Sequence, residues 1–136
     1  MGAYAKHREN YGMRFAYNTD YVPPAPHLEI RLAVPDETFR MAPLAVLVDT
    51  GADATIVPLR YIEPLGAQID NRKYLCSQWG ERRIVDVYLL DVQIGDIRLP
   101  LIEIVADERG TEAILGRSVL NRLTMVLDGP KQILEI

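Results

Sequence analysis

The sequence predicts an all-β domain with a closed, barrel-like or sandwich architecture. Short apolar or alternating runs of strand length recur along the whole chain, and turn residues separate them. Only one clear helix pattern is present, close to the C-terminus. Many short strands joined by turns are typical of sandwiches and barrels. The chain has 136 residues, of which 49% are hydrophobic, so it is long enough for one domain with its own core.

We expect residues 1–27 to form an N-terminal arm and an extended connector, followed by the domain at residues 28–136. Residues 13–17 alternate as a short strand would. Three prolines within residues 22–26 favour an extended chain, because proline fixes φ and lacks an N–H donor.

The first half of the domain contains three predicted strands. Residues 28–32 alternate apolar and charged side chains, as a half-buried strand does, and residues 40–48 are almost wholly apolar, as a buried strand is. Residues 54–58 are a short strand that ends at a proline. One or two helical turns are expected over residues 59–65.

Two hairpins follow. Residues 72–94 read as two strands around the segment Ser77-Gln78-Trp79-Gly80-Glu81. Gly95-Asp96, between Ile94 and Ile97, is a strong signal for a two-residue hairpin turn that leads to a strand at 98–105.

The last part of the chain closes the domain. Residues 112–116 are a short apolar strand that ends in glycine, and Ser118 is expected to cap the one clear helix. Residues 123–127 and 132–136 are predicted to be two closing strands.

Charge and hydropathy argue against two classes of partner. The net charge of −4 offers no basic field for nucleic acid. The longest apolar run, Met41 to Val48, is eight residues and cannot span a bilayer. Charged residues such as Lys6 interrupt the N-terminus where a signal peptide would be apolar, so we expect a cytoplasmic protein without a membrane partner.

The residue types also argue against a metal centre or a cofactor. Cys76 is the single cysteine, so an internal disulfide is impossible, and His7 and His27 are the only histidines. Without a Cys/His cluster we expect no metal and no cofactor, and no Ser-His or Cys-His nucleophile pair.

The most informative stretch is the apolar run that ends in Asp49-Thr50-Gly51. A strand that ends in this way holds a carboxylate on a tight turn. Asp, Thr and Gly are also common in ordinary turns, so on these three residues alone a plain turn remains open. A weaker echo follows at Ala113-Ile114-Leu115-Gly116, another apolar strand that ends at glycine.

Four parts of the chain, in order, resemble the retropepsin-like, single-domain aspartic proteases. They are Asp49-Thr50-Gly51-Ala52-Asp53, a hairpin at 74–88, Ile114-Leu115-Gly116-Arg117, and a short helix after it. The resemblance covers residues 28–136. It implies a closed barrel-like or sandwich acid-protease fold with one short helix in the C-terminal region and a flap hairpin. The implied activity is that of an aspartic endopeptidase.

In such enzymes two carboxylates share one proton, so that one activates a water and the other polarises the peptide carbonyl. This chain has a single Asp-Thr-Gly, and none of its other aspartates is followed by Thr-Gly or Ser-Gly. A pair of carboxylates therefore requires Asp49 from two copies of the chain. The resemblance thus implies an isologous homodimer that acts on a peptide or protein substrate.

The resemblance also assigns roles within the loop. Asp49 would be the catalytic carboxylate, and Thr50 would bond to the partner chain near the two-fold axis. Gly51 would let the backbone approach the substrate closely. Ala52 and Asp53 would line the substrate cleft.

A second set of residues would support this loop. Ile114, Leu115 and Gly116 would pack beneath it, and Arg117 would form an ion pair with Asp53.

The flap tip would consist of Gln78, Trp79 and Gly80, which also face the cleft. It lacks the glycine-rich tip of retroviral enzymes, and Trp79 would either close over the substrate or pack on its own sheet. The segment 132–136 would either form the dimer interface or complete the chain's own sheet.

Two other functions remain open at this point. The fold would also serve a dimeric peptide-binding module with little or no turnover. Asp49 would otherwise be a turn residue in a monomeric β domain.

Overall fold

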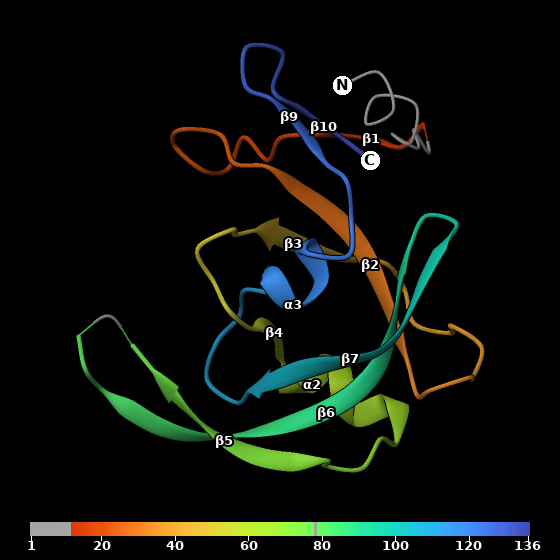
Figure 1. Cartoon of the computed structure of the whole chain (residues 1–136), viewed down its shortest axis with the longest axis vertical. Coiled ribbons are helices and arrows are strands. Elements are labelled where there is room, and N and C mark those ends of the chain that lie inside the picture. The colour runs from red at the N-terminus through yellow and green to blue at the C-terminus, as the bar shows by residue number, and fades with distance from the viewer. Residues whose placement is uncertain (1–11, 78) are drawn as a thin grey trace, which may run out of the picture.

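The computed structural model describes residues 12–77 and 79–136, and it consists mainly of β-strands (Figure 1). The strands form one seven-stranded and one three-stranded sheet. The prediction of an all-β, barrel-like domain is confirmed.

Six strands of the larger sheet close into a barrel. Its order is β2 (His27–Ala33), β3 (Leu44–Val48), β8 (Ile114–Leu115), β4 (Thr55–Pro58), β7 (Ile97–Asp107) and β6 (Arg82–Ile94). The end of β2 pairs with β6, as in Leu32 opposite Val92, and this pairing closes the ring. The seventh strand, β5 (Asn71–Cys76), pairs only with β6, and the two form the long hairpin at the lower left of Figure 1.

Two pairings in the barrel are parallel, β3 with β8 and β4 with β7. The short strand β8 lies between β3 and β4. Residues 114–115 are therefore held beside two strands that come much earlier in the sequence. This insertion places the segment 114–117 next to the end of β3.

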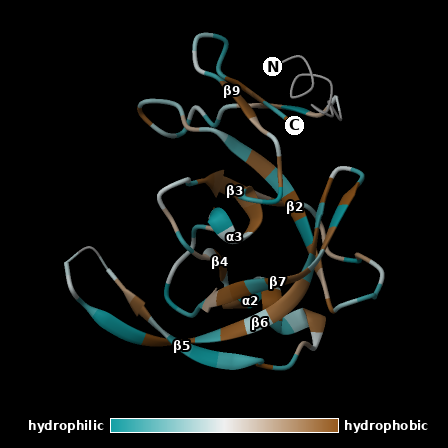
Figure 2. Cartoon of the chain, in the orientation of Figure 1, coloured by the Kyte–Doolittle hydropathy of each residue, from teal (hydrophilic) through white to brown (hydrophobic). Residues whose placement is uncertain are grey.

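Alternation along the strands builds the core. Leu28, Ile30 and Leu32 of β2 are almost completely buried, whereas Glu29 between them is exposed. Leu90, Val92 and Ile94 of β6 are fully buried in the same cluster. In Figure 2, β3 is hydrophobic along its length and the first half of β5 is hydrophilic, as expected for a strand outside the barrel.

Several predicted element boundaries were wrong. The closing strand expected at 123–127 begins only at Val126. The strand expected at 40–48 begins only at Leu44, because Pro43 has no N–H to give to the ladder. The N–H of Leu32 instead donates to the sulfur of Met41 over 3.1 Å. The helix α3 (Arg117–Leu120) has Gly116, not Ser118, at its N-cap position.

The described residues contain one further α-helix, α2 (Leu59–Ile62), followed by the 3-10 turn η1 (Glu63–Leu65). Gly66 ends this segment with a left-handed φ of 68°. No helix in residues 12–77 or 79–136 is long and apolar enough to cross a membrane.

The three-stranded sheet is built from both ends of the described chain. Its order is β1 (Arg14–Ala16), β10 (Ile133–Glu135) and β9 (Val126–Asp128). Because β10 is the central strand, the segment 132–136 completes the chain's own sheet, which was one of the two alternatives. Strand β1 lies within the segment that we expected to be an arm.

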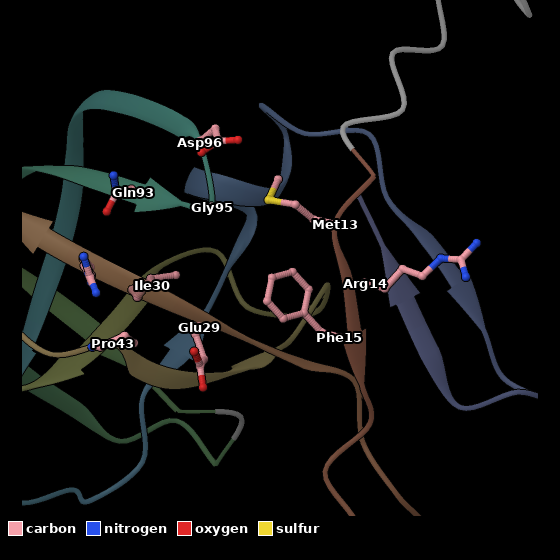
Figure 3. Close-up of a pocket in the computed structure, with 10 residues that line it drawn as sticks. Met13, Arg14, Phe15, Glu29, Ile30, Pro43, Gln93, Gly95 and Asp96 are labelled. Atoms are coloured by element: carbon pink, nitrogen blue, oxygen red, sulfur yellow. The ribbon is translucent and has the colours of Figure 1, made fainter.

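Figure 3 shows how the small sheet meets the barrel. A cavity of about 500 Å³ lies between β1 and the barrel, and Phe15, Glu29 and Asp96 are among the residues that line it. Met13 reaches Gly95 in the turn between β6 and β7. A Cβ atom at Gly95 would lie 1.9 Å from the sulfur of Met13, and the φ of Gly95 is 55°. The left-handed φ therefore favours glycine in this turn, and a side chain at position 95 would displace the Met13 side chain. The predicted two-residue hairpin is confirmed.

Among the described residues, Asp91 on β6 is the only charged residue that is buried, with 1% exposure. Its Oδ2 accepts hydrogen bonds from the N–H of Asp36 at 3.0 Å and from Nε of Arg98 at 2.9 Å. Its Oδ1 accepts the N–H of Leu101 at 2.9 Å. This last bond holds the irregular part of β7, where Leu101 has a φ of 54°.

Burial alone would raise the pKa of Asp91. The two N–H groups and the Arg98 guanidinium outweigh burial and hold the pKa below its usual value. A carboxyl whose pKa is lower in the folded chain stabilises the fold at neutral pH. That stabilisation is present above the unfolded-state pKa of about 3.9 and is lost as the pH falls through the folded-state value.

We predict that Asp91→Ala lowers the free energy of unfolding by about 3 kcal/mol, because it leaves the buried face of Arg98 and two N–H groups without their acceptor. Urea denaturation at neutral pH measures this change. In a pH series, acidification should lower the free energy of unfolding less in the variant than in the wild type, because the contribution of Asp91 is already absent.

Glu29→Ala is the matched control, because Glu29 is an exposed carboxylate of β2. Its effect should stay within about 0.5 kcal/mol. Equal stability of the Asp91→Ala and Glu29→Ala variants would contradict the role of Asp91.

Candidate active site

Asp49 lies at the C-terminal end of β3 and is half-buried. Its backbone N–H donates to the carbonyl of Leu115 on β8 over 3.0 Å. The preceding residue, Val48, donates its N–H to the carbonyl of Pro26 on the other side, also over 3.0 Å. The strand is therefore held from both flanks up to the residue that carries the carboxylate.

The loop after Asp49 orients that carboxylate. The N–H of Gly51 donates to Asp49 Oδ1 over 2.9 Å, and the N–H of Ala52 donates to the Asp49 carbonyl over 3.2 Å. A Cβ atom at Gly51 would lie 3.2 Å from the same Oδ1. A side chain at position 51 would therefore crowd the carboxylate. Thr50 and Gly51 are both exposed in the single chain.

Arg117 ties this loop to α3. Its guanidinium donates to the carbonyl of Thr50 over 2.8 Å and forms an ion pair with Asp53. Its backbone N–H donates to the carbonyl of Ala52 over 2.9 Å. The expected ion pair between Asp53 and Arg117 is present. The Asp53 side chain is 88% exposed, so the pair contributes mainly to the shape of the loop.

Gly116 allows the two loops to approach each other. A Cβ atom at this position would lie 2.1 Å from the carbonyl oxygen of Ala54 and 2.9 Å from that of Ala52. Both neighbours are backbone atoms, which cannot move aside as a flexible side chain would. Ile114 and Leu115 pair beside the end of β3, so the segment supports the loop as expected.

A pair of hydroxyl groups, not foreseen from the sequence, connects the same two segments. Thr55 is completely buried, and its Oγ1 lies 2.8 Å from Oγ of Ser118. The Thr55 Oγ1 also accepts the N–H of Gly116 over 3.1 Å. A threonine at the start of the otherwise apolar strand Thr55–Pro58 was the available signal, because a buried hydroxyl needs a partner.

Hydrogen bonds connect the described residues near the tip of the hairpin that we expected to be the flap. Ser77 Oγ accepts the N–H groups of Trp79 and Glu81, each over 3.2 Å, and the N–H of Ser77 donates to the Glu81 carbonyl. Gly80 has a φ of 80°, which favours glycine. Gln78, another residue predicted at this tip, lies outside the described residues.

Trp79 is 82% exposed. It therefore does not pack on its own sheet in this structure, and that alternative was wrong for the single chain.

In Figure 1 the hairpin, the loop after β3 and the loop between β7 and β8 all project from the same side of the barrel.

The base of the hairpin meets the loop through a small apolar cluster. Val85, Val87 and Val105 are its buried members. Ala54 and Ile56, which follow the Asp49 loop, and Leu75 of β5 pack against them. One face of the hairpin therefore packs against Ala54 and Ile56, the residues that follow the Asp49 loop.

The described residues include no group of three or more His, Cys, Asp or Glu side chains that could hold a metal ion. One carboxylate alone cannot both remove a proton from water and donate one to a carbonyl oxygen.

Comparison with known proteins gives one family. The model of the family described as gag-polyprotein putative aspartyl protease matches residues 38–122, which include the Asp49 loop and Arg117. No curated protein matches the chain.

Two solved structures share the fold. A retropepsin-like aspartic protease from Rickettsia conorii is 19% identical, with a TM-score of 0.60, over 91% of this chain and 88% of that one. The EIAV protease, in complex with the inhibitor HBY-793, is also 19% identical, with a TM-score of 0.57, over 83% of this chain and all of that one.

We predict that Thr55→Val lowers the free energy of unfolding by about 1–3 kcal/mol, because the change keeps the shape but leaves the Gly116 N–H without its acceptor. Urea denaturation at one fixed protein concentration measures it. Thr55→Ser keeps the hydroxyl and should lose less. A valine variant that is more stable than the serine variant would contradict the role of the hydroxyl pair.

Proposed function

Because the chain belongs to the gag-polyprotein putative aspartyl protease family, we propose that it is an aspartic endopeptidase whose active site is assembled from Asp49 of two copies. The observation that carries this proposal is the position of Asp49. Its carboxylate ends a buried strand and accepts the Gly51 N–H, while Leu115 and Arg117 fix the surrounding backbone.

The proposed dimer follows from the number of carboxylates. Asp49-Thr50-Gly51 occurs once in the sequence, so the second carboxylate comes from a second copy across a two-fold axis. Strand β10 already pairs on both sides with β9 and β1. A partner strand that extends this sheet would therefore add at β1 or β9.

In the proposed reaction, a water molecule lies between the two Asp49 carboxylates, which share one proton. The ionised carboxylate removes a proton from the water. The water oxygen then attacks the peptide carbonyl carbon. The protonated carboxylate donates its proton to the carbonyl oxygen. The carboxyl that took up the water proton then donates it to the amide nitrogen, while the other carboxylate removes a proton from a hydroxyl group of the intermediate. The C–N bond breaks as the carbonyl re-forms, which releases an amine and a carboxylic acid.

The β5–β6 hairpin is proposed to act as the flap. An extended peptide would lie between this hairpin and the Asp49 loop, with strand-like backbone pairing. The exposed Trp79 at the tip would then cover the substrate. The partly exposed members of the apolar cluster, Ile56 and Leu75, would contact apolar substrate side chains.

We predict that Asp49→Asn lowers peptide cleavage by about a thousand-fold or more, because it removes the acid–base group from both copies. The asparagine oxygen can still accept the Gly51 N–H, so the fold and the dimer should persist. Cleavage of a peptide library and sedimentation of the same preparation measure both properties.

Asp70→Asn is the matched control. The Asp70 carboxylate is exposed, and within the described residues its side chain accepts a hydrogen bond only from the neighbouring Asn71. Unchanged cleavage by a clean Asp49→Asn preparation would refute the proposal. Peptide binding without cleavage by the wild type would indicate a binding module, and a strictly monomeric wild type would indicate that Asp49 is a turn residue.

We predict that peptide binding shifts the fluorescence of Trp79 to shorter wavelength, because the ring passes from water to an apolar contact. Trp79 is the only tryptophan of the chain, so the signal is specific. The Asp49→Asn protein allows the titration without cleavage. An unshifted spectrum at saturating peptide would show that the tip does not cover the bound peptide.

A further inference from the structure

Two adjoining cavities lie between the β5–β6 hairpin and the loop between β7 and β8. Their volumes are about 560 and 180 Å³, and both are lined by Arg83 and Arg109. The larger one is also lined by Arg82. We call the larger cavity, with its three arginines, the arginine pocket.

Asp107 organises the arginine pocket. Its Oδ1 forms an ion pair with Arg83 over 3.1 Å and accepts the N–H of Arg109 over 3.1 Å. A Cβ atom at Gly110 would lie 1.9 Å from Asp107 Oδ2, so a side chain at this position would displace the carboxylate from its present place. Asp107 thus connects the hairpin to the loop that carries Arg109.

This connection persists in acid. Burial alone would raise the pKa of Asp107. The Gly110 and Arg109 N–H groups and the Arg83 guanidinium outweigh burial and hold the pKa below its usual value. The ion pair with Arg83 therefore remains formed at pH values where ordinary carboxylates begin to take up protons.

The arginine pocket is on the cleft side of the hairpin. Arg83 lies directly opposite Leu75 in the β5–β6 register, and residues opposite each other share one face of an antiparallel pair. Leu75 packs against the cluster that contains Ala54 and Ile56, just after the Asp49 loop. Arg83 therefore lies on the face of the hairpin that packs against the residues after the Asp49 loop.

The pocket carries an excess of positive charge. Glu81 is the only acidic residue that lines it, against Arg82, Arg83 and Arg109. Counting Asp107 as well, three guanidinium groups face two carboxylates. Within residues 12–77 and 79–136, the ion pairs include Arg83 but neither Arg82 nor Arg109.

We propose that the arginine pocket binds an acidic side chain of the substrate, so that the enzyme prefers peptides with Glu or Asp close to the cleaved bond. Guanidinium groups favour carboxylates because their paired N–H donors match the two oxygens. The inference rests on the proposed endopeptidase function and specifies its substrate class. Apolar substrate residues would contact Ile56 and Leu75, while an acidic one would enter the arginine pocket.

The preference should depend on pH through the peptide itself. A Glu side chain of a peptide loses its charge below its pKa of about 4.3. The acidic groups near the pocket are Glu81, Asp86, Asp107 and Glu108. Protonation of any of these would only make the pocket more positive. Loss of the preference in acid therefore has to arise from the substrate carboxyl.

The experiment compares peptide pairs that differ only by Glu or Gln, with the variable residue moved stepwise along the peptide. At one position, kcat/KM at about pH 6 should be about 10-fold higher for Glu than for Gln. The ratio should approach one at about pH 3. A ratio near one at every position at about pH 6 would overturn the proposal.

Variants localise the effect. Arg109→Gln leaves the Arg83–Asp107 ion pair in place and should reduce the ratio several-fold, and Arg83→Gln should reduce it as well. Arg72→Gln is the matched control, because Arg72 lies on the other face of the same hairpin and pairs with Asp86. An unchanged ratio in Arg109→Gln and in Arg83→Gln would overturn the assignment to this pocket.

Binding separates this inference from the proposed function. The Asp49→Asn protein is titrated with the same Glu and Gln peptides by calorimetry. If the wild type cleaves nothing but the Glu peptides bind more tightly, the pocket is supported and the endopeptidase function fails. If the wild type cleaves peptides without any preference and the binding is equal, the pocket is refuted and the endopeptidase function is supported.

Discussion

The site depends on the parallel pairing of β3 with β8, in which the Asp49 N–H donates to the Leu115 carbonyl. This bond joins the residue that carries the carboxylate to a segment far along the chain. The strand β8 is only two residues long, so Gly116 and Arg117 follow immediately and fall beneath the Asp49 loop. Without the close approach at Gly116, the Arg117 guanidinium would not reach the Thr50 carbonyl.

The sequence was sufficient to predict the parts of the site that local pattern encodes. The apolar run before Asp49 and the apolar run before Gly116 both contain strands, although these strands, β3 and β8, are shorter than the runs. The ion pair of Asp53 with Arg117 came from the family resemblance, and the structure contains it. The all-β class followed from the spacing of strands and turns, although β8 is too short to be recognised alone as a barrel strand.

The hydroxyl pair beneath the loop and the contacts of Asp107 were not predictable from the sequence, because they depend on contacts between distant segments of the chain. Ser118 resembled a helix cap, but the helix starts at Arg117 and its hydroxyl lies beside Thr55. Nothing near Thr55 in the sequence indicates that partner. The charge of Asp107 is likewise ordinary in the sequence, and only the β6–β7 pairing and the tight loop bring Arg83 and Arg109 to it.

Three aspartates illustrate how surroundings decide the role of a carboxylate. Asp91 is buried and both of its oxygens are occupied by donors, so it holds the fold. Asp107 is half-buried and connects two elements while the Arg109 side chain beside it stays without an ion pair among the described residues. Asp49 receives one N–H from its own loop, at the exposed end of a rigid strand. Of the three, Asp49 has the most capacity left to bind water or a second carboxylate.

The two-fold symmetry of the proposed dimer has a consequence for the arginine pocket. Two copies would present two pockets, one on each side of the shared carboxylates. A bound peptide has a direction and lacks this symmetry, so its acidic side chains would meet the two pockets at different distances from the cleaved bond. The dimer would therefore accept an acidic residue on either side of that bond, and a peptide with one on each side would use both pockets.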